Sequence, residues 1–269
     1  MPSAKILEPQ GSKNNELYFQ FKKINHQFVQ LRNENHVQYD RLAQIARTKL
    51  NESAERVMAV LDPLKLVVTG LPEELTEVSV PNFPQAPEKG SHSVPVDSTI
   101  FIDESDFRLV DSEDYFGLAP NKAVNLKYIG RVICDSVELD PAGKPVLLKC
   151  SYQGNDAGEK PKGTIQWVPA KFVLPVEVRL YNLLFTVDEP SDVDWEQQLN
   201  PQSEIVKPRA LVDASLLRLS PQPEMHLQFE RLGFFVVDKD SKEDKLIFNL
   251  TVNLKDSKPK LEGVQNRWE

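Results

Sequence analysis

The sequence predicts a mainly β, barrel-rich protein that is preceded by a helical segment. Proline is abundant and glycine is sparse, with 20 Pro and 11 Gly in 269 residues. Short runs of β-branched residues alternate with clusters of Pro, Asp and Asn, a pattern that favours barrels over an α/β enzyme. Helical spacing of apolar residues occurs only within about the first 50 residues. The length is typical of about two domains.

The N-terminal segment predicts two helices after a short tail. Residues 1–12 contain Pro2, Pro9 and Gly11 and show no period. Apolar residues then recur at helical spacing in two stretches, 17–31 and 37–50. We therefore expect one helix in each stretch.

From Arg56 onward, the pattern indicates strands almost throughout. The predicted strands cover residues 57–60, 64–69, 76–80, 98–102, 123–129, 131–139, 146–152, 164–168 and 176–181. Pro169 and Pro175 interrupt the ladder between the last two, which predicts a hairpin-like corner there. No internal repeat is evident in the sequence.

Charge and hydropathy restrict the classes of partner. The sequence has no apolar run of about 18 residues and no signal-peptide core, which favours a soluble protein with a cytoplasmic location. The net charge of −8 argues against indiscriminate binding of nucleic acid. Residues 1–50 carry a net charge of +4 and the rest carries −12. Any contact with RNA is therefore local, or depends on the N-terminal segment.

The two cysteines, Cys134 and Cys150, lie in neighbouring predicted strands and could face each other across a hairpin. With two cysteines and no secretory signal, reduced and buried thiols are favoured over a disulfide.

Several segments together resemble one known family. The most distinctive is GTIQWVPAKFVLPVEVRLYNLLF at residues 163–185. Further segments that match the same family lie at residues 50–66, 81–95, 101–107, 200–201 and 228–235. They occur in the same order as in the family. Together they resemble the C-terminal, anticodon-binding half of glutaminyl-tRNA synthetase over roughly residues 35–257. Several motifs in register are far more specific than one short pattern.

The resemblance implies two nested β-barrels of the ribosomal protein L25-like anticodon-binding fold. The helical segment would occupy residues 1–50. The proximal barrel would take residues 51–113 and 204–269, and the distal barrel residues 114–203. The N-terminal helices would then contact the inside of the tRNA, or else pack on the barrel or form a contact between protein chains.

The resemblance also implies the residues that would contact RNA. Arg56, Gln228 and Arg231 match positions that read the middle anticodon base, and Lys127 and Ser257 match further contact positions. Arginine and glutamine donors suit the carbonyl oxygens of uracil. The alternative is that these arginines are surface residues paired with Glu230 or Glu55.

The chain departs from the family at the positions facing the outer anticodon bases. Where the family has Tyr-x-Arg-Leu-x-x-Gly-Lys-x-Val-Arg-Leu, two arginines are replaced by Gly117 and Asn125, and a glutamine is replaced by Asp114. The loss of two cations and the gain of a carboxylate beside RNA predict weaker contacts with the outer bases.

No catalytic residues are predicted. The family's catalytic signatures, a His-x-Gly-His-like turn and a Met-Ser-Lys-like loop, do not occur in the sequence, and neither does a glycine-rich phosphate loop. The acidic residues between Asp103 and Asp114 lack the spacing of a calcium loop, which favours a solvated loop over a metal site. Trp167 lies in an apolar strand and is expected in the core. We expect neither a metal nor a cofactor.

The sequence thus predicts a non-catalytic module that binds the anticodon arm of a glutamine-type tRNA. It would be a free-standing paralogue or a fragment of glutamine–tRNA ligase. The alternative is a structural or interaction subunit that has lost anticodon readout. A third possibility is nonspecific RNA binding through the N-terminal segment 1–50, which has a net positive charge. Residues 12–50 are the candidate for contact with a protein partner, and no membrane contact is expected.

Overall fold

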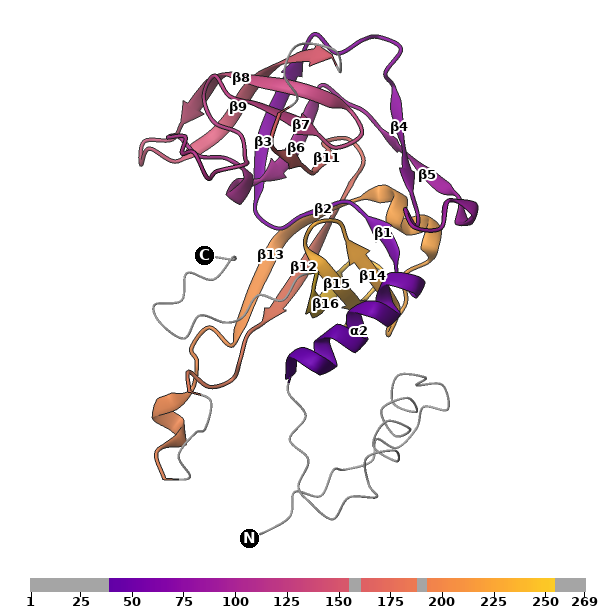
Figure 1. Cartoon of the computed structure of the whole chain (residues 1–269), viewed down its shortest axis with the longest axis vertical. Coiled ribbons are helices and arrows are strands. Elements are labelled where there is room, and N and C mark those ends of the chain that lie inside the picture. Colours follow the sequence, from indigo (N-terminus) through magenta and orange to yellow (C-terminus); the bar gives the residue numbers. More distant parts are fainter. Residues whose placement is uncertain (1–38, 155–160, 188–192, 255–269) are drawn as a thin grey trace. The chain divides into compact units, whose positions relative to one another are not determined.

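The computed structural model describes residues 39–154, 161–187 and 193–254, and its architecture is mainly β, as predicted (Figure 1). The predicted helix at 17–31 lies outside the described residues. Contacts within the chain separate residues 1–42 from a compact unit that begins at Ala43, and the fold described below is that unit. Helix α2 (Tyr39–Ser53) agrees with the second predicted helix. Its residues Ala43 and Leu50 pack against Phe234 and Val252.

The first sheet curls into a barrel-like structure, which we call the proximal barrel. Its strand order is β1-β14-β15-β16-β12-β13-β2. The strands are β1 (Glu55–Val57), β2 (Ala59–Val60), β12 (Val173–Tyr181), β13 (Glu204–Asp213), β14 (His226–Phe229), β15 (Gly233–Val237) and β16 (Leu246–Asn253). In its core, the ring of Phe229 stacks on Phe235 at 4.4 Å and meets Phe248 edge-on at 5.1 Å between centroids.

The second sheet forms the distal barrel, with the strand order β10-β7-β8-β9-β3-β6-β11. The strands are β3 (Pro63–Thr69), β6 (Thr99–Asp103), β7 (Ala123–Leu126), β8 (Gly130–Leu139), β9 (Pro145–Gly154), β10 (Thr164–Ile165) and β11 (Trp167–Pro169). Trp167 is fully buried, as expected. Cys134 and Cys150 face each other in the β8–β9 register as buried free thiols, which agrees with the sequence prediction.

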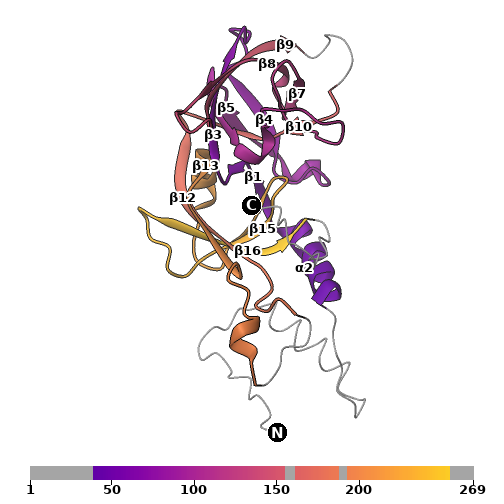
Figure 2. The same ribbon diagram turned by 90° about the vertical axis from the view of Figure 1, so that its left-hand side faces the viewer.

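Smaller elements connect these strands. A separate hairpin of β4 (Glu77–Pro81) and β5 (Ser91–Pro95) lies between β3 and β6 in the chain. Four 3-10 helices complete the described secondary structure: η1 (Pro87–Lys89), η2 (Glu104–Asp106), η3 (Trp195–Gln198) and η4 (Ala214–Leu219). Figure 2 shows β12 and β13 running together as a long ribbon.

The two barrels share one strand plan, which the sequence analysis missed. Along each sheet the pairing is parallel, antiparallel, antiparallel, parallel, antiparallel, antiparallel. The short strands β1 and β2 of the proximal barrel therefore correspond to β10 and β11 of the distal barrel. The fold is thus a structural repeat in which β1 and β2 come far ahead of the rest of the proximal barrel in the sequence, whereas β10 and β11 come last in the distal barrel.

Two buried aspartates occupy equivalent places in this plan. Asp213 ends β13 and caps η4, since its carboxylate accepts hydrogen bonds from the backbone and hydroxyl of Ser215. Asp103 ends β6 and caps η2 through Ser105 in the same way. Each carboxylate also accepts a backbone N–H from the crossover at 58–62, Asp213 from Met58 at 3.0 Å and Asp103 from Leu61 at 2.9 Å. The crossover between the barrels is thus held from both sides.

The strand pairing corrects the predicted corner at 164–181. β11 pairs with β6, whereas β12 pairs with β13 and β16, so the two strands belong to different barrels and form no hairpin. The proline-interrupted segment between them is the second crossover. The pairing also divides the chain at other points than the predicted boundaries. β3 and β6, within the predicted proximal barrel, pair in the distal one, and β12, within the predicted distal barrel, pairs in the proximal one.

Candidate functional site

A buried carboxylate joins the turns of the two barrels. Glu230 lies in the turn between β14 and β15, and its side chain is 1% exposed. Its oxygens accept a hydrogen bond from the Tyr128 hydroxyl at 2.9 Å and contact the Lys127 ammonium at 2.7 Å. Lys127 and Tyr128 come from the corresponding turn of the distal barrel, between β7 and β8. A buried carboxylate requires such paired partners, so Glu230 fixes both turns.

Arg56 and Gln228 extend this cluster within the proximal barrel. They are direct neighbours in the parallel register of β1 and β14. The Arg56 Nε donates to Gln228 Oε1 at 3.0 Å, and an Arg56 terminal nitrogen lies 4.0 Å from Glu230 Oε1. Gln228 is 4% exposed, so this bond holds its amide in one orientation. The amide oxygen points to Arg56, and the NH₂ group is the donor of the same amide.

Arg231 occupies the turn beside Glu230 in a left-handed backbone conformation. Its φ is 61°, and Tyr128 at the equivalent turn of the distal barrel has φ 68°. Such angles are uncommon outside glycine and cluster at functional sites. Both ends of the Arg231 guanidinium donate to the carboxylate of Asp106, at 2.8 and 3.0 Å. This fork-to-fork geometry holds the guanidinium with its side chain 34% exposed.

The two tyrosines of this region remain protonated. Burial raises the pKa of Tyr128, and the neighbouring Glu230 carboxylate raises it further. Burial also raises the pKa of Tyr115, with Asp106 adding to the effect. The Tyr128 hydroxyl therefore stays a donor to Glu230. The formal charges of the site come from the three cations Arg56, Lys127 and Arg231 and from two carboxylates.

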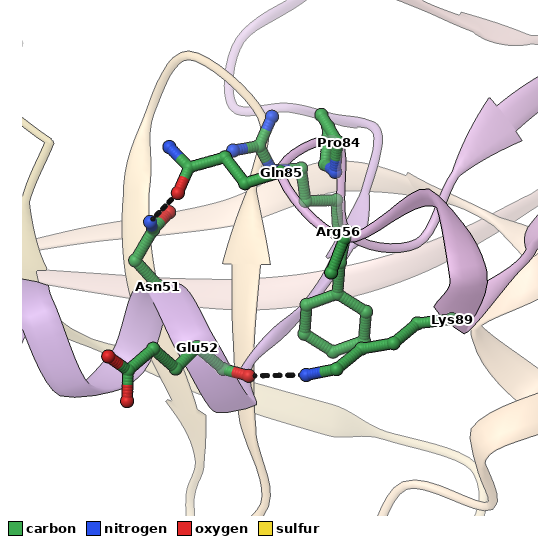
Figure 3. A pocket seen from close by; sticks show the side chains of 8 residues that line it. Asn51, Glu52, Arg56, Pro84, Gln85 and Lys89 are labelled. Carbon is green, nitrogen blue, oxygen red and sulfur yellow. Dashed lines mark hydrogen bonds between the residues drawn. The ribbon is translucent and has the colours of Figure 1, made fainter.

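A pocket of about 190 Å³ opens beside Arg56 (Figure 3). It is lined by the C-terminal end of α2, by β1, by the loop before η1 and by η1 itself, through Asn51, Glu52, Arg56, Phe83, Pro84, Gln85, Ala86 and Lys89. Asn51 Nδ2 donates to Gln85 Oε1 at 3.0 Å, and the Lys89 ammonium donates to the Glu52 carbonyl at 2.9 Å. Lys89 also lies 4.2 Å from the centroid of the Phe83 ring. Arg56 thus belongs both to this pocket and to the Glu230 cluster.

Three acidic residues between 103 and 114 contact other parts of the protein. Asp103 holds the crossover, Asp106 pairs with Arg231, and Asp111 accepts from Lys122 at 2.5 Å, which lowers the pKa of Asp111. In the part of the chain that the structure describes, no three His, Cys, Asp or Glu side chains gather in a way that could hold a metal ion. No helix among the described residues is long and apolar enough to cross a membrane.

Comparison with known families assigns most of this fold. Residues 54–153 match a family described as "tRNA synthetases class I (E and Q), anti-codon binding domain", and residues 164–238 match a second family model with the same description. The chain belongs to this anticodon-binding family. The matched ranges of the anticodon-binding domain include Arg56, Lys127, Gln228, Glu230 and Arg231.

Curated relatives of this anticodon-binding domain are glutamine–tRNA ligases. A probable glutamine–tRNA ligase of Dictyostelium discoideum is 41% identical over 83% of this chain and 29% of its own length. The glutamine–tRNA ligase of Aliivibrio fischeri is 39% identical over 83% of this chain and 42% of its own. That of Lupinus luteus is 39% identical over 82% and 29%. The chain therefore spans less than half the length of these relatives.

The structure brings together four of the five predicted site residues of the anticodon-binding domain. Arg56, Gln228 and Lys127 meet around Glu230, and Arg231 occupies the same turn as Glu230. Ser257 lies outside the described residues. The partners of the site arginines differ in part from Glu230 and Glu55, which the alternative interpretation named. Glu55 pairs with Arg218 at 2.8 Å, and Arg231 pairs with Asp106.

Sequence reasoning missed two members of the site, Tyr128 and Asp106, and treated Glu230 only as a possible partner of a surface arginine. The sequence did contain a signal for Tyr128. Leu126-Lys-Tyr-Ile-Gly130 and Phe229-Glu-Arg-Leu-Gly233 are matching turn sequences in the two barrels. Comparing them would have paired Lys127 with Glu230 and Tyr128 with Arg231.

Proposed function

We propose that this chain binds the anticodon arm of a glutamine-type tRNA and serves as the tRNA-recognising part of a glutamine–tRNA ligase. The observation that carries the proposal is the convergence of Arg56, Gln228 and Lys127 on the buried Glu230, with Arg231 beside them. Because the chain spans 29–42% of its ligase relatives, we propose that aminoacylation itself belongs to another part of such an enzyme.

The cluster offers donors suited to the edges of an unstacked base. Single-stranded RNA is usually recognised by splaying bases out and reading their edges. Arg56 presents several N–H groups and Gln228 an NH₂ group, which match the two carbonyl oxygens of uracil at the middle anticodon position. The pocket beside Arg56 provides room for an unstacked base, with the Phe83 ring and the amides of Asn51 and Gln85 on its walls.

The electrostatics of the cluster favour specific contacts over general attraction. Glu230 and Asp106 neutralise part of the charge of Lys127, Arg56 and Arg231, and the whole chain carries a net charge of −8. Long-range attraction to phosphates is therefore weak. Preorganised side chains that need little reordering on binding supply the affinity instead.

The test is binding of the full chain to unmodified glutamine tRNA and to a variant changed only at the middle anticodon base, across a salt series. We expect the base change to cost about 1–3 kcal/mol, the range for a good bidentate base contact. Arg56→Lys keeps the charge and loses the planar fork, so it should remove this discrimination while retaining most of the salt dependence.

Arg209→Ala is the matched control, because Arg209 is an exposed arginine on β13 away from this cluster. It should leave the discrimination unchanged. Binding that ignores the middle base in the unaltered chain contradicts the proposal and favours a structural subunit. Loss of binding on removal of residues 1–38, with no effect of Arg56→Lys, would favour the basic segment. The deletion ends at residue 38 because α2 packs into the core.

A further inference from the structure

The two residues that depart from the family pattern, Gly117 and Asn125, lie near Phe116, which has an exposed ring. Phe116 precedes Gly117 and is 57% exposed. A Cβ at Gly163 would overlap the carbonyl oxygen of Phe116, so the two backbones touch there. The Gly163 carbonyl in turn accepts a hydrogen bond from the Asn125 backbone N–H at 2.9 Å. Phe116 is therefore next to the edge of the distal barrel where Asn125 lies.

Gly117 is required by the structure and could not carry a longer side chain. A Cβ there would lie 2.6 Å from the Asp106 carbonyl oxygen and would collide with the Tyr115 ring. The Tyr115 hydroxyl donates to the Ser105 carbonyl at 3.2 Å, which keeps the ring in this place. An arginine at this position is thus excluded by packing, and Asp106 is the residue that holds Arg231.

The strand that pairs with Asn125 carries a positively charged side chain. Arg131 of β8 is the direct register partner of Asn125 in β7. Direct cross-strand partners present their side chains on the same face, about 5 Å apart at Cβ. Val124 and Leu126 point into the core, so Asn125 and Arg131 share the outer face, and Lys127 follows on that face two residues later.

We infer that this part of the distal barrel holds an outer anticodon base by stacking on Phe116, with Arg131 contacting the adjacent phosphate. The inference rests on the proposed function. Stacking uses the π face that every base has and therefore tolerates different bases, whereas edge contacts do not. The chain then distinguishes the middle base by its edges and accepts several bases at this outer position.

The decisive experiment measures affinity of the full chain for glutamine tRNA that is intact or carries an abasic nucleotide at the first or the third anticodon position. Phe116→Ala should weaken binding of intact tRNA by about 5-fold or more, the size of one lost stacking contact. Phe116→Trp should retain binding. At one of the two abasic positions, Phe116→Ala should have no further effect, because the ring has lost its base.

The matched control is Phe172→Ala, another exposed phenylalanine, at 50%, on the crossover between β11 and β12. It should leave both affinities unchanged. Arg131→Ala should reduce binding of all anticodon variants equally. It should also lower the slope of log affinity against log salt concentration by the amount of about one phosphate contact. Arg131→Lys should have neither effect.

Two results separate this inference from the proposed function. Intact middle-base discrimination with no effect of Phe116→Ala, or with an equal effect on intact and both abasic tRNAs, overturns the stacking site alone. A tenfold or greater loss on changing the base at the outer position whose abasic form is insensitive to Phe116→Ala also overturns it. Failure of the unaltered chain to distinguish the middle base overturns the proposed function, and the stacking site with it.

Discussion

At the scale of single residues, Arg231 combines an unfavourable backbone with a favourable side-chain contact. A left-handed conformation costs an L-residue about 1–2 kcal/mol because its Cβ approaches the backbone. The bidentate contact with Asp106, at 2.8 and 3.0 Å, offsets part of this cost. Residues in sparsely populated conformations persist only where their surroundings determine them, and they cluster at functional sites.

Replacing Arg231 separates these two contributions. Both Arg231→Ala and Arg231→Gly lose the contact with Asp106, so both should lower the free energy of unfolding. Glycine adopts φ near 61° without steric cost, so Arg231→Gly should be about 1 kcal/mol more stable than Arg231→Ala. Urea denaturation of the three proteins measures the difference.

In the control, the order of stability of the glycine and alanine variants should be reversed. Arg209 lies in β13 at the irregularity of its pairing with β12 and has no positive φ, so glycine there should be destabilising by about 0.5–1 kcal/mol relative to alanine. Arg209→Gly should therefore be less stable than Arg209→Ala. If the glycine variant were the less stable one at both positions, backbone conformation at Arg231 would carry no cost.

At the scale of elements, the β4–β5 hairpin depends on polar contacts with its neighbours. A two-stranded hairpin is marginally stable by itself. Arg218 of η4 donates to Asn82 at 3.1 Å, lies 3.0 Å from His92 Nδ1, and pairs with Glu55 of β1 at 2.8 Å. Burial, with a smaller effect of the Arg218 charge, lowers the pKa of His92 from 6.5 to about 4. His92 is therefore neutral in the folded protein near neutral pH.

This shift predicts a loss of stability in mild acid. Below pH 6.5 the unfolded chain binds a proton at His92 that the folded chain does not, until the pH reaches about 4. The free energy of unfolding should fall across this window by up to about 3 kcal/mol. Burial also lowers the pKa of His226, which acts in the same direction. His92→Gln should therefore flatten the curve only in part, as measured by urea denaturation at several pH values. An unchanged pH dependence in His92→Gln would contradict a buried neutral histidine.

The elements as far as β12 could largely be predicted from sequence, whereas β5, the strands after β12 and the pairing of the strands were not predicted. β-branched runs and turn residues are local signals, and they located β3, β8, β9 and β12 to within a few residues. Pairing depends on contacts between distant segments, so the local pattern at 164–181 indicated a hairpin where the chain crosses between barrels. The site residues Arg56 and Gln228 came from family resemblance, because nothing local reveals that Glu230 is buried between them.

At the scale of the whole molecule, the shared strand plan explains how the site is built. Each barrel contributes a three-residue turn with one left-handed residue, Tyr128 in one and Arg231 in the other. Contacts between those turns place Lys127 and Glu230 together. The plan was hidden in the sequence because β1 and β2 come first in the chain, whereas their equivalents β10 and β11 come after the other strands of the distal barrel. Spacing between equivalent residues is therefore not constant, and a search for a fixed period fails.

The crossover at 58–62 is where this plan can be tested energetically. Asp103 and Asp213 each use one oxygen to cap a 3-10 helix and the other to accept N–H groups of the crossover. Asparagine has one accepting oxygen, so Asp103→Asn and Asp213→Asn should each lose one of these roles. We expect each change to lower the free energy of unfolding by about 1–3 kcal/mol, the cost of leaving buried groups unpaired.

Because both aspartates hold the same five-residue crossover, their effects should not add. Once one substitution releases the segment, the second has less to lose, so the double variant should be more stable than the sum of the single changes predicts, by about 0.5 kcal/mol or more. Urea denaturation of the four proteins closes the cycle, with Asp240→Asn on an exposed turn as the control. Strict additivity would show that the two carboxylates stabilise separate barrels, and that the crossover does not couple the barrels on which the proposed anticodon-binding site depends.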